Sequence, residues 1–110
     1  MFEKLFFSKY VECILFFLYV NKKSYGRELS EHFSISNSVV QNVLHQLEDS
    51  NLLIGIQSGK TKNYEFNKKY YFYTNFFGLI EKAYKSLPKD KQDAYVSYKR
   101  KRPRKSGKPL

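Results

Sequence analysis

The chain has 110 residues, of which 42% are hydrophobic and 18% aromatic, so it is long enough for one domain whose core needs no covalent staple. A single cysteine, Cys13, excludes an internal disulfide, and with only two histidines it argues against a cysteine-rich zinc site. The net charge of +10 is uneven, because residues 99–110 (KRKRPRKSGKPL) hold seven cations and no acid and leave +3 for the remainder. Such asymmetry indicates a nucleic-acid partner or, less often, an anionic membrane surface.

The most apolar run, ILFFLYV at residues 14–20, is much shorter than the roughly 20 residues that a membrane-spanning helix needs. Polar residues precede it, and no small-residue cleavage site of a signal peptide follows it. We therefore expect a buried helix in a cytoplasmic, nucleoid-associated protein that has no membrane partner.

Three helices are predicted in the first half of the chain. The first covers residues 7–20 and carries an apolar stripe wide enough to be covered on more than one side. The second covers residues 25–33, with Ser24 as its N-cap. The third follows a short break, begins with Ser36 as its N-cap and runs to about Ser50.

The period then changes from helical to alternating. Residues 52–57 (LLIGIQ) are short, apolar and β-prone, residues 61–67 (TKNYEFN) alternate, and the turn between them contains glycine, so the two runs predict a β-hairpin. The helical period returns over residues 70–87 and is closed by Pro88. A short helical turn is expected next, and the last dozen residues, dense in like charges, are expected to be disordered when free.

This order of elements, with LSEHFSISNSVVQNVLHQLEDSNLL at residues 29–53, resembles the winged helix-turn-helix repressors of the ArsR and MarR type. The matching apolar positions lie in the first motif helix, in the turn and on the buried face of the recognition helix: Leu29, Phe33, Ile35, Val40, Leu44 and Leu47. Residues 64–88 (YEFNKKYYFYTNFFGLIEKAYKSLP) are similar to the end of ArsR-like proteins, where a long helix after the wing pairs two subunits. The resemblance covers roughly residues 7–88.

The resemblance implies a mainly α-helical fold with a small β-hairpin wing, that is, an α+β fold. Residues 1–88 would form a winged helix-turn-helix DNA-binding domain with a C-terminal dimerisation helix, and residues 89–110 a basic tail. Two features depart from the family pattern. Ser34 stands where these proteins usually have a glycine in a left-handed conformation, which costs some strain. The recognition helix also lacks the family's usual arginine.

The polar face of the predicted recognition helix carries no lysine or arginine, and its members are Asn37, Ser38, Gln41, Asn42 and His45. Asparagine and glutamine can bond both N6 and N7 of adenine in the major groove, which is worth roughly 1–3 kcal/mol of base discrimination. We interpret this face as a base-reading surface, with charges elsewhere binding phosphate. The alternative is an ordinary solvated helix face.

Contacts with the DNA backbone are expected from three places. They are the wing tip, the start of the second helix and the start of the recognition helix, with the residues Lys60, Thr61, Lys62, Tyr25, Arg27 and Ser36. The alternative for the wing tip is a solvated lysine turn.

The tail offers a second set of DNA contacts. Residues 100–105 (RKRPRK) look like an AT-hook, whose core is Arg-Gly-Arg-Pro, but Lys101 replaces the glycine and should hinder close seating in a narrow minor groove. The contacts would come from Arg100, Arg102, Arg104 and Lys105. We favour the alternative of a non-specific basic arm, which raises affinity and salt dependence together.

The helix predicted over residues 70–87 has more apolar residues than one packed face needs, and its stripe includes Phe72, Phe76, Phe77, Ile80 and Tyr84. We interpret the stripe as a dimer interface that is shared with the first helix; a ligand pocket and a plain monomer core are the alternatives. A two-fold dimer would place two recognition helices about one turn of DNA apart, which implies a palindromic site.

No catalytic set is visible, because the sequence has no phosphate-binding glycine loop, no nucleophile elbow and no paired carboxylates in an apolar context. We expect no enzyme activity, no metal and no cofactor, and the sequence names no small-molecule effector. The leading hypothesis is a homodimeric, sequence-specific binder of double-stranded DNA that represses transcription. The alternatives are a protein-interaction or adaptor module, for example beside a nucleotidyltransferase or in a toxin–antitoxin pair, and a non-specific chromosome-architecture protein.

Overall fold

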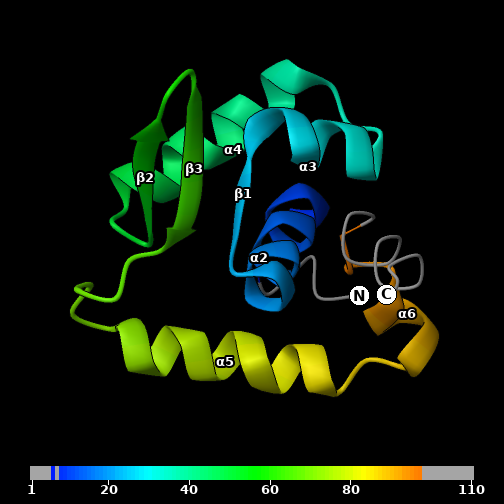
Figure 1. The fold of residues 1–110 in the computed structure, drawn as a ribbon. Coiled ribbons are helices and arrows are strands. Elements are labelled where there is room, and N and C mark those ends of the chain that lie inside the picture. Colours follow the sequence, from blue (N-terminus) through cyan, green and yellow to red (C-terminus); the bar gives the residue numbers. More distant parts are fainter. Residues whose placement is uncertain (1–5, 7, 98–110) are drawn as a thin grey trace, which may run out of the picture.

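The computed structural model describes residue 6 and residues 8–97 (Figure 1). Within these residues the fold is α+β, as the sequence predicts, with five helices and one three-stranded antiparallel sheet. The elements in chain order are α2 (Lys9–Asn21), β1 (Lys23–Tyr25), α3 (Gly26–Phe33), α4 (Asn37–Asp49), β2 (Leu53–Ser58), β3 (Thr61–Phe66), α5 (Tyr73–Lys85) and α6 (Lys89–Asp93).

Serine side chains cap the N-termini of two of the helices. Ser8 Oγ accepts hydrogen bonds from the backbone N–H groups of Tyr10 (3.0 Å) and Val11 (3.4 Å) at the start of α2. Ser36 Oγ accepts one from the N–H of Val39 (3.4 Å) at the start of α4, which confirms the predicted N-cap. These bonds satisfy donors that the first turn of a helix leaves unpaired.

The predicted N-cap at Ser24 is wrong, because residues 23–25 form strand β1 and α3 begins only at Gly26. Ser24 pairs with Tyr64 across β1 and β3, and its Oγ donates to Glu28 Oε1 at 2.7 Å. A strand of three residues is too short to show alternation in the sequence, so pairing with a distant strand decides the conformation here.

The sheet has the strand order β1–β3–β2, so β3 lies in the centre. Strands β2 and β3 form the predicted hairpin, in which Leu53 pairs with Phe66. Gly59 in the turn has a φ of 63°, a left-handed conformation that glycine adopts without steric cost. Tyr64 and Phe66 are both buried on the core face, as the alternation of this run predicts.

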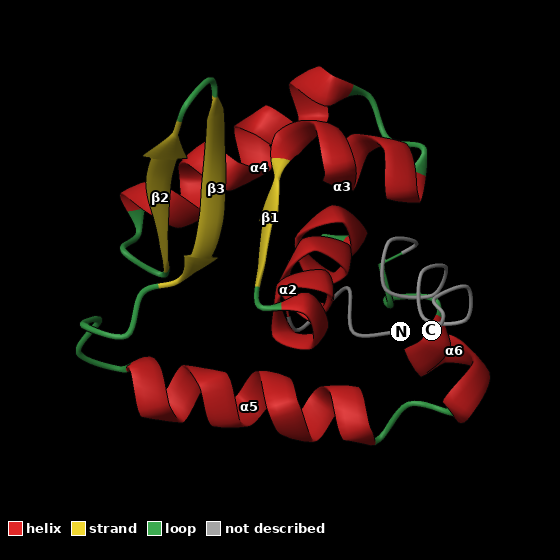
Figure 2. Ribbon diagram, viewed as in Figure 1, coloured by secondary structure: helices red, strands yellow, loops and turns green. Residues whose placement is uncertain are grey.

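Helix α2 lies in the middle of the fold, between α5 on one side and α3, α4 and the sheet on the other (Figure 2). Residues 14–18 are all buried, although they are consecutive in the sequence. A helix that is enclosed on several sides needs apolar residues around most of its circumference, which explains the wide apolar stripe. No helix in the described part of the chain is long and apolar enough to cross a membrane.

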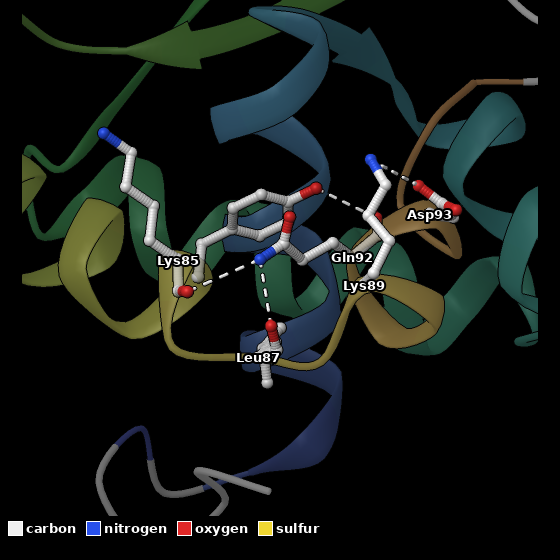
Figure 3. Close-up of polar contacts among 6 residues, drawn as sticks. Lys85, Leu87, Lys89, Gln92 and Asp93 are labelled. Atoms are coloured by element: carbon white, nitrogen blue, oxygen red, sulfur yellow. Dashed lines mark hydrogen bonds and ion pairs between the residues drawn. The ribbon is translucent and has the colours of Figure 1, made fainter.

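Helix α5 passes through a sharp turn into α6, the short helix predicted there (Figure 3). Gln92 holds this turn, because its Nε2 donates to the carbonyl of Leu87 at 2.9 Å and its own carbonyl accepts from Tyr84 OH at 2.9 Å. Lys89 and Asp93 form an ion pair along α6, with 3.5 Å between Nζ and Oδ1. The turn between the two helices is therefore fixed by polar contacts.

After α6, residues 94–97 form a segment that we call the strap, because it is bonded back to the end of α2. Asn21 donates through Nδ2 to the carbonyl of Tyr95 at 2.8 Å, and its Oδ1 accepts from the N–H of Ser97 at 3.1 Å. The side chains of Asn21 and Ser97 belong to the few buried polar residues of the described chain. Ordered packing thus continues to Ser97, beyond residue 88, the predicted end of the domain.

Ser34 ends α3 in the left-handed region, with φ 55° and ψ 46°, as expected from its place in the motif. A residue with a β-carbon loses about 1–2 kcal/mol of stability in this region, and glycine would recover that amount. The greater freedom of glycine in the unfolded chain offsets about 0.4–1 kcal/mol of this recovery. We therefore expect Ser34→Gly to raise the free energy of unfolding by about 0.5–1 kcal/mol, measured by urea denaturation.

Ser50→Gly is the matched control, because Ser50 also ends a helix but has a φ of −82°. This replacement relieves no strain and removes the Oγ hydrogen bond to the carbonyl of Gln46 at 2.9 Å, so it should lower stability. A Ser34→Gly chain no more stable than the wild type would show that the turn is not strained.

Candidate nucleic-acid interface

The start of α3, one side of α4 and the hairpin surround a cleft of about 740 Å³. The residues that line it are Tyr25, Gly26, Arg27, Glu31, Gln41, His45, Lys60, Thr61, Lys62 and Tyr64. Seven of these were predicted from the sequence to touch DNA, and they come from β1, α3, α4, β3 and the turn of the hairpin. In Figure 1 the hairpin tip and the start of α3 lie on the upper side, whereas α5 runs along the lower side.

Two packing relations bring these side chains together. Tyr25 pairs with Asn63 at the end of β1, which sets the first turn of α3 beside the hairpin. Helix α4 buries Val40 and Leu44 in the core, and helical spacing then leaves Gln41 and His45 on the side that faces the cleft. The cleft is therefore a product of the sheet and of the amphipathic pattern of α4.

The Gln41 side chain lies directly over Gly26 in the first turn of α3. A β-carbon at Gly26 would overlap Nε2 of Gln41, so the absence of a side chain at Gly26 lets the Gln41 amide lie in this place. Because Gln41 is half-buried, its amide is restrained at the wall of the cleft. A restrained amide loses less side-chain entropy when it forms hydrogen bonds with a ligand.

Carboxylates of the chain itself neutralise two cations of the cleft. Arg27 Nε lies 3.1 Å from Glu31 Oε2, and Lys62 Nζ lies 3.2 Å from Glu48 Oε1. The hydrogen bond to Glu48 is the main cause that raises the pKa of Lys62, so its ammonium stays protonated. Lys60, in contrast, makes no ion pair with any residue that the structure describes.

The remaining predicted DNA contacts on α4 lie outside the lining of the cleft. Asn37, Ser38 and Asn42 are exposed along the helix. Ser36 caps the helix and lines a separate hollow of about 420 Å³, together with Cys13 of α2. The polar face of α4 is thus divided, with Gln41 and His45 in the cleft and the other three side chains beyond it.

The stripe predicted as a dimer interface is largely occupied within the chain. Ile80 has an exposed fraction of 0% and belongs to the core, and Phe76 and Phe77 pack on Phe66 with ring centroids 6.3 and 5.5 Å apart. Tyr84 packs on α2 and donates to Gln92, as described above. Only Phe72, at the start of α5, keeps about half of its surface exposed (52%).

The predicted tail contacts, Arg100, Arg102, Arg104 and Lys105, lie outside the described residues. Four residues at or beside the cleft were not predicted from the sequence: Gly26, Glu31, Glu48 and Tyr64. The spacing of Arg27 and Glu31, four residues apart on a helix, is a signal that could have revealed their ion pair. Glu48 and Lys62 are joined only by the fold of the hairpin, so no sequence signal connects them.

No protein-family model, curated protein or solved structure matches the chain. Among the described residues, no group of three or more histidine, cysteine, aspartate or glutamate side chains is placed to hold a metal ion. The side chains that line the cleft supply one amide, one imidazole, several hydroxyl groups and three cations. These groups are suited to hydrogen bonding and to binding anions.

Replacing Gly26 with alanine tests the restraint on Gln41. The new β-carbon should displace the Gln41 amide, while the fold should be kept because the displaced atom is the end of a flexible side chain and alanine favours a helix. We expect the side-chain NH₂ resonances of Gln41 to move in an NMR spectrum and the free energy of unfolding to change by less than about 1 kcal/mol.

Gly78→Ala is the matched control, because Gly78 also lies in a helix and a β-carbon there meets no atom within 4 Å. This variant should gain stability and leave the Gln41 resonances in place. Unmoved Gln41 resonances in the Gly26→Ala chain would contradict the proposed contact.

Proposed function

We propose that the chain is a winged helix-turn-helix protein that binds double-stranded DNA sequence-specifically as a homodimer and regulates transcription, most simply as a repressor. The observation that carries this proposal is the cleft, which joins hydrogen-bonding side chains of α4 to cations of α3 and of the hairpin. Base recognition needs hydrogen-bonding groups on an element that fits a groove, and positioning needs cations beside it. The cleft combines the hydrogen-bonding groups with the cations.

In the proposed complex, α4 is the recognition helix and enters the major groove, which admits an α-helix. Gln41 and His45 in the cleft, with Asn42 further along the exposed side, face the base edges. Lys60 at the tip of the hairpin, acting as the wing, and Arg27 at the start of α3 reach the phosphates on either side. Base reading would explain why the exposed face of α4 is rich in amides and uncharged, since a face that only contacts water needs neither property.

The arrangement of the elements also supports the winged-helix assignment. Helices α3 and α4 are separated by a three-residue break in which Ser34 takes the left-handed conformation. The hairpin follows α4 directly, and β1 completes its sheet. This is the order that the family resemblance implies.

The proposed homodimer uses α5, on the side of the molecule away from the hairpin tip (Figure 1). Phe72 and Leu79 are exposed there to 52% and 43% of their surface, although both are large apolar residues. Their burial against a second α5 would remove this surface from water. A two-fold axis through the helix pair would present two copies of α4 to a palindromic site.

The basic tail contributes in this proposal as a non-specific arm. Its seven cations supply contacts with phosphate whose strength falls steeply with salt. A repressor of this kind would act by occupying promoter DNA and excluding the polymerase. No cofactor is required for that action.

A protein-interaction module is the second candidate, and the exposed aromatic pair at the start of α5 favours it. Tyr71 and Phe72 are both exposed, with ring centroids 4.7 Å apart. Exposed adjacent aromatic side chains are common in protein interfaces. The oligomeric state of the purified chain and its preference among duplexes distinguish this candidate from the leading proposal.

The base-reading role is tested with a duplex selected by the wild-type chain from a random pool, and a scrambled duplex of equal composition. The wild type should prefer the selected duplex by about 10³-fold or more at 0.15 M salt. Replacing Gln41 and Asn42 together with alanine should reduce this ratio by at least about tenfold, because two base contacts are lost. Fluorescence anisotropy gives both dissociation constants.

Gln46→Ala is the matched control, since Gln46 is an exposed amide of the same helix outside the cleft. Its ratio should equal that of the wild type. A preserved ratio in the double variant would remove α4 as the reader. A pool without enrichment would favour an architectural binder instead.

The dimer is tested by Leu79→Glu, which places a charge in the proposed apolar contact between two α5 helices. Sedimentation at micromolar concentration should give twice the chain mass for the wild type and the chain mass for the variant. Thr74→Glu is the control, because Thr74 is also exposed on α5 but lies on another face of the helix than Leu79, so the dimer should stay intact. A wild-type chain that sediments as a monomer while it saturates DNA would refute the homodimer.

A further inference from the structure

The two ion pairs at the cleft share one feature: in both, a cation that could meet a phosphate is held by a carboxylate of the same chain. Arg27 and Glu31 lie one turn apart on α3, and their side chains are exposed to 83% and 69%. Lys62 and Glu48 join β3, one residue from the hairpin turn, to the last turn of α4, and their side chains are exposed to 40% and 31%. Both pairs are therefore open to solvent and to an incoming anion.

The fold builds a specific place for the Glu48–Lys62 pair. The side chain of Lys62 lies over Gly55 of β2, where any β-carbon would overlap it, and Glu48 Oε2 would lie 3.1 Å from that β-carbon. Gly55 thus leaves the space in which the carboxylate and the ammonium meet. Lys62 also lies over the ring of Tyr64, with 5.3 Å from Nζ to the centroid, which limits where the ammonium can go.

Exposed ion pairs of this kind are weak, because water and salt screen both charges. A phosphate group offers the cation a full negative charge and also releases counterions from the duplex. A phosphate can therefore displace either carboxylate at a small but measurable cost. Apart from these pairs, Lys60 is the cleft cation without an ion pair among the described residues.

We propose that Glu31 and Glu48 are internal competitors of phosphate, which hold Arg27 and Lys62 in the free protein and thereby lower the affinity of the cleft for every duplex. This inference rests on the proposed DNA-binding function. It assigns the encounter with DNA mainly to the basic tail and the choice of sequence to α4. The carboxylates change neither the encounter nor the choice of sequence, since they lower the affinity for the selected and the scrambled duplex alike.

The competition has a distinctive salt signature. When phosphate displaces Glu48, the released carboxylate attracts a cation from solution, and this uptake offsets part of the counterion release from the duplex. The DNA affinity of the wild-type chain should therefore fall less steeply with salt than that of a chain with a neutral side chain at position 48. A carboxylate that merely braced the hairpin, with Lys62 away from the DNA, would leave no such signature.

The test compares the wild type, Glu48→Gln and Asp93→Asn in the full chain, on the selected and the scrambled duplex, between 0.05 and 0.2 M salt. The Asp93→Asn control also removes one carboxylate and frees one lysine, Lys89, but on α6, away from the hairpin tip (Figure 1). Glu48→Gln should bind both duplexes about two- to fivefold more tightly. Its plot of log K against log salt should be steeper, by at most about 0.9, the value for one phosphate contact, because position 48 no longer takes up a cation when Lys62 turns to the DNA.

Asp93→Asn should differ from the wild type by less than about 1.5-fold at 0.15 M salt, since the Debye length there is about 8 Å. Glu31→Gln is the second variant and should act in the same direction through Arg27. Thermal melts confirm that each variant is folded. Affinity and slope equal to those of Asp93→Asn, or weaker binding, would overturn the competition while leaving the proposed function intact. Loss of sequence preference in the wild type would instead overturn the proposed function.

Discussion

The pairing of β1 with β3 is the constraint on which the candidate interface depends. It joins the residue that precedes α3 to the centre of the sheet, with Ser24 opposite Tyr64 and Tyr25 opposite Asn63. The first turn of α3 therefore starts at a fixed distance from the hairpin, and the cleft forms between them. Because Ser24 is buried and bonded to Glu28, the same contact also fixes the direction in which α3 leaves the sheet.

Much of the fold could be predicted because its signals are local. A serine at a helix start, a glycine turn between two alternating runs and a left-handed residue at a helix end each act over a few residues, and they place Ser36, the hairpin and Ser34 correctly. The rest depends on contacts between distant segments. Strand β1 exists only through β3, and the strap is held by side chains of α2 and α3 such as Asn21 and His32, so neither has a period of its own in the sequence.

The candidate site divides in the same way. Helical spacing on α4 predicts which side chains lie opposite the buried face, and Gln41 and His45 are found in the cleft as a result. Spacing cannot predict which part of that face the hairpin approaches. Asn42 was expected to act together with Gln41, but it lies outside the cleft. It also cannot separate a dimer stripe from a core stripe, since both are apolar with one period, and Ile80 is entirely buried within its own chain.

Strand β2 is an edge of the sheet, and this has a consequence for how the protein behaves in concentrated solution. Its residues LIGIQS include no charge and no proline, and Ile54 and Ile56 are exposed. An unguarded edge of this type can pair with the same edge of another copy, and the mutual repulsion of chains with a net charge of +10 opposes that encounter. Salt shortens the range of the repulsion to about 3 Å at 1 M. A purification step in strong salt therefore also removes a protection of the protein against aggregation.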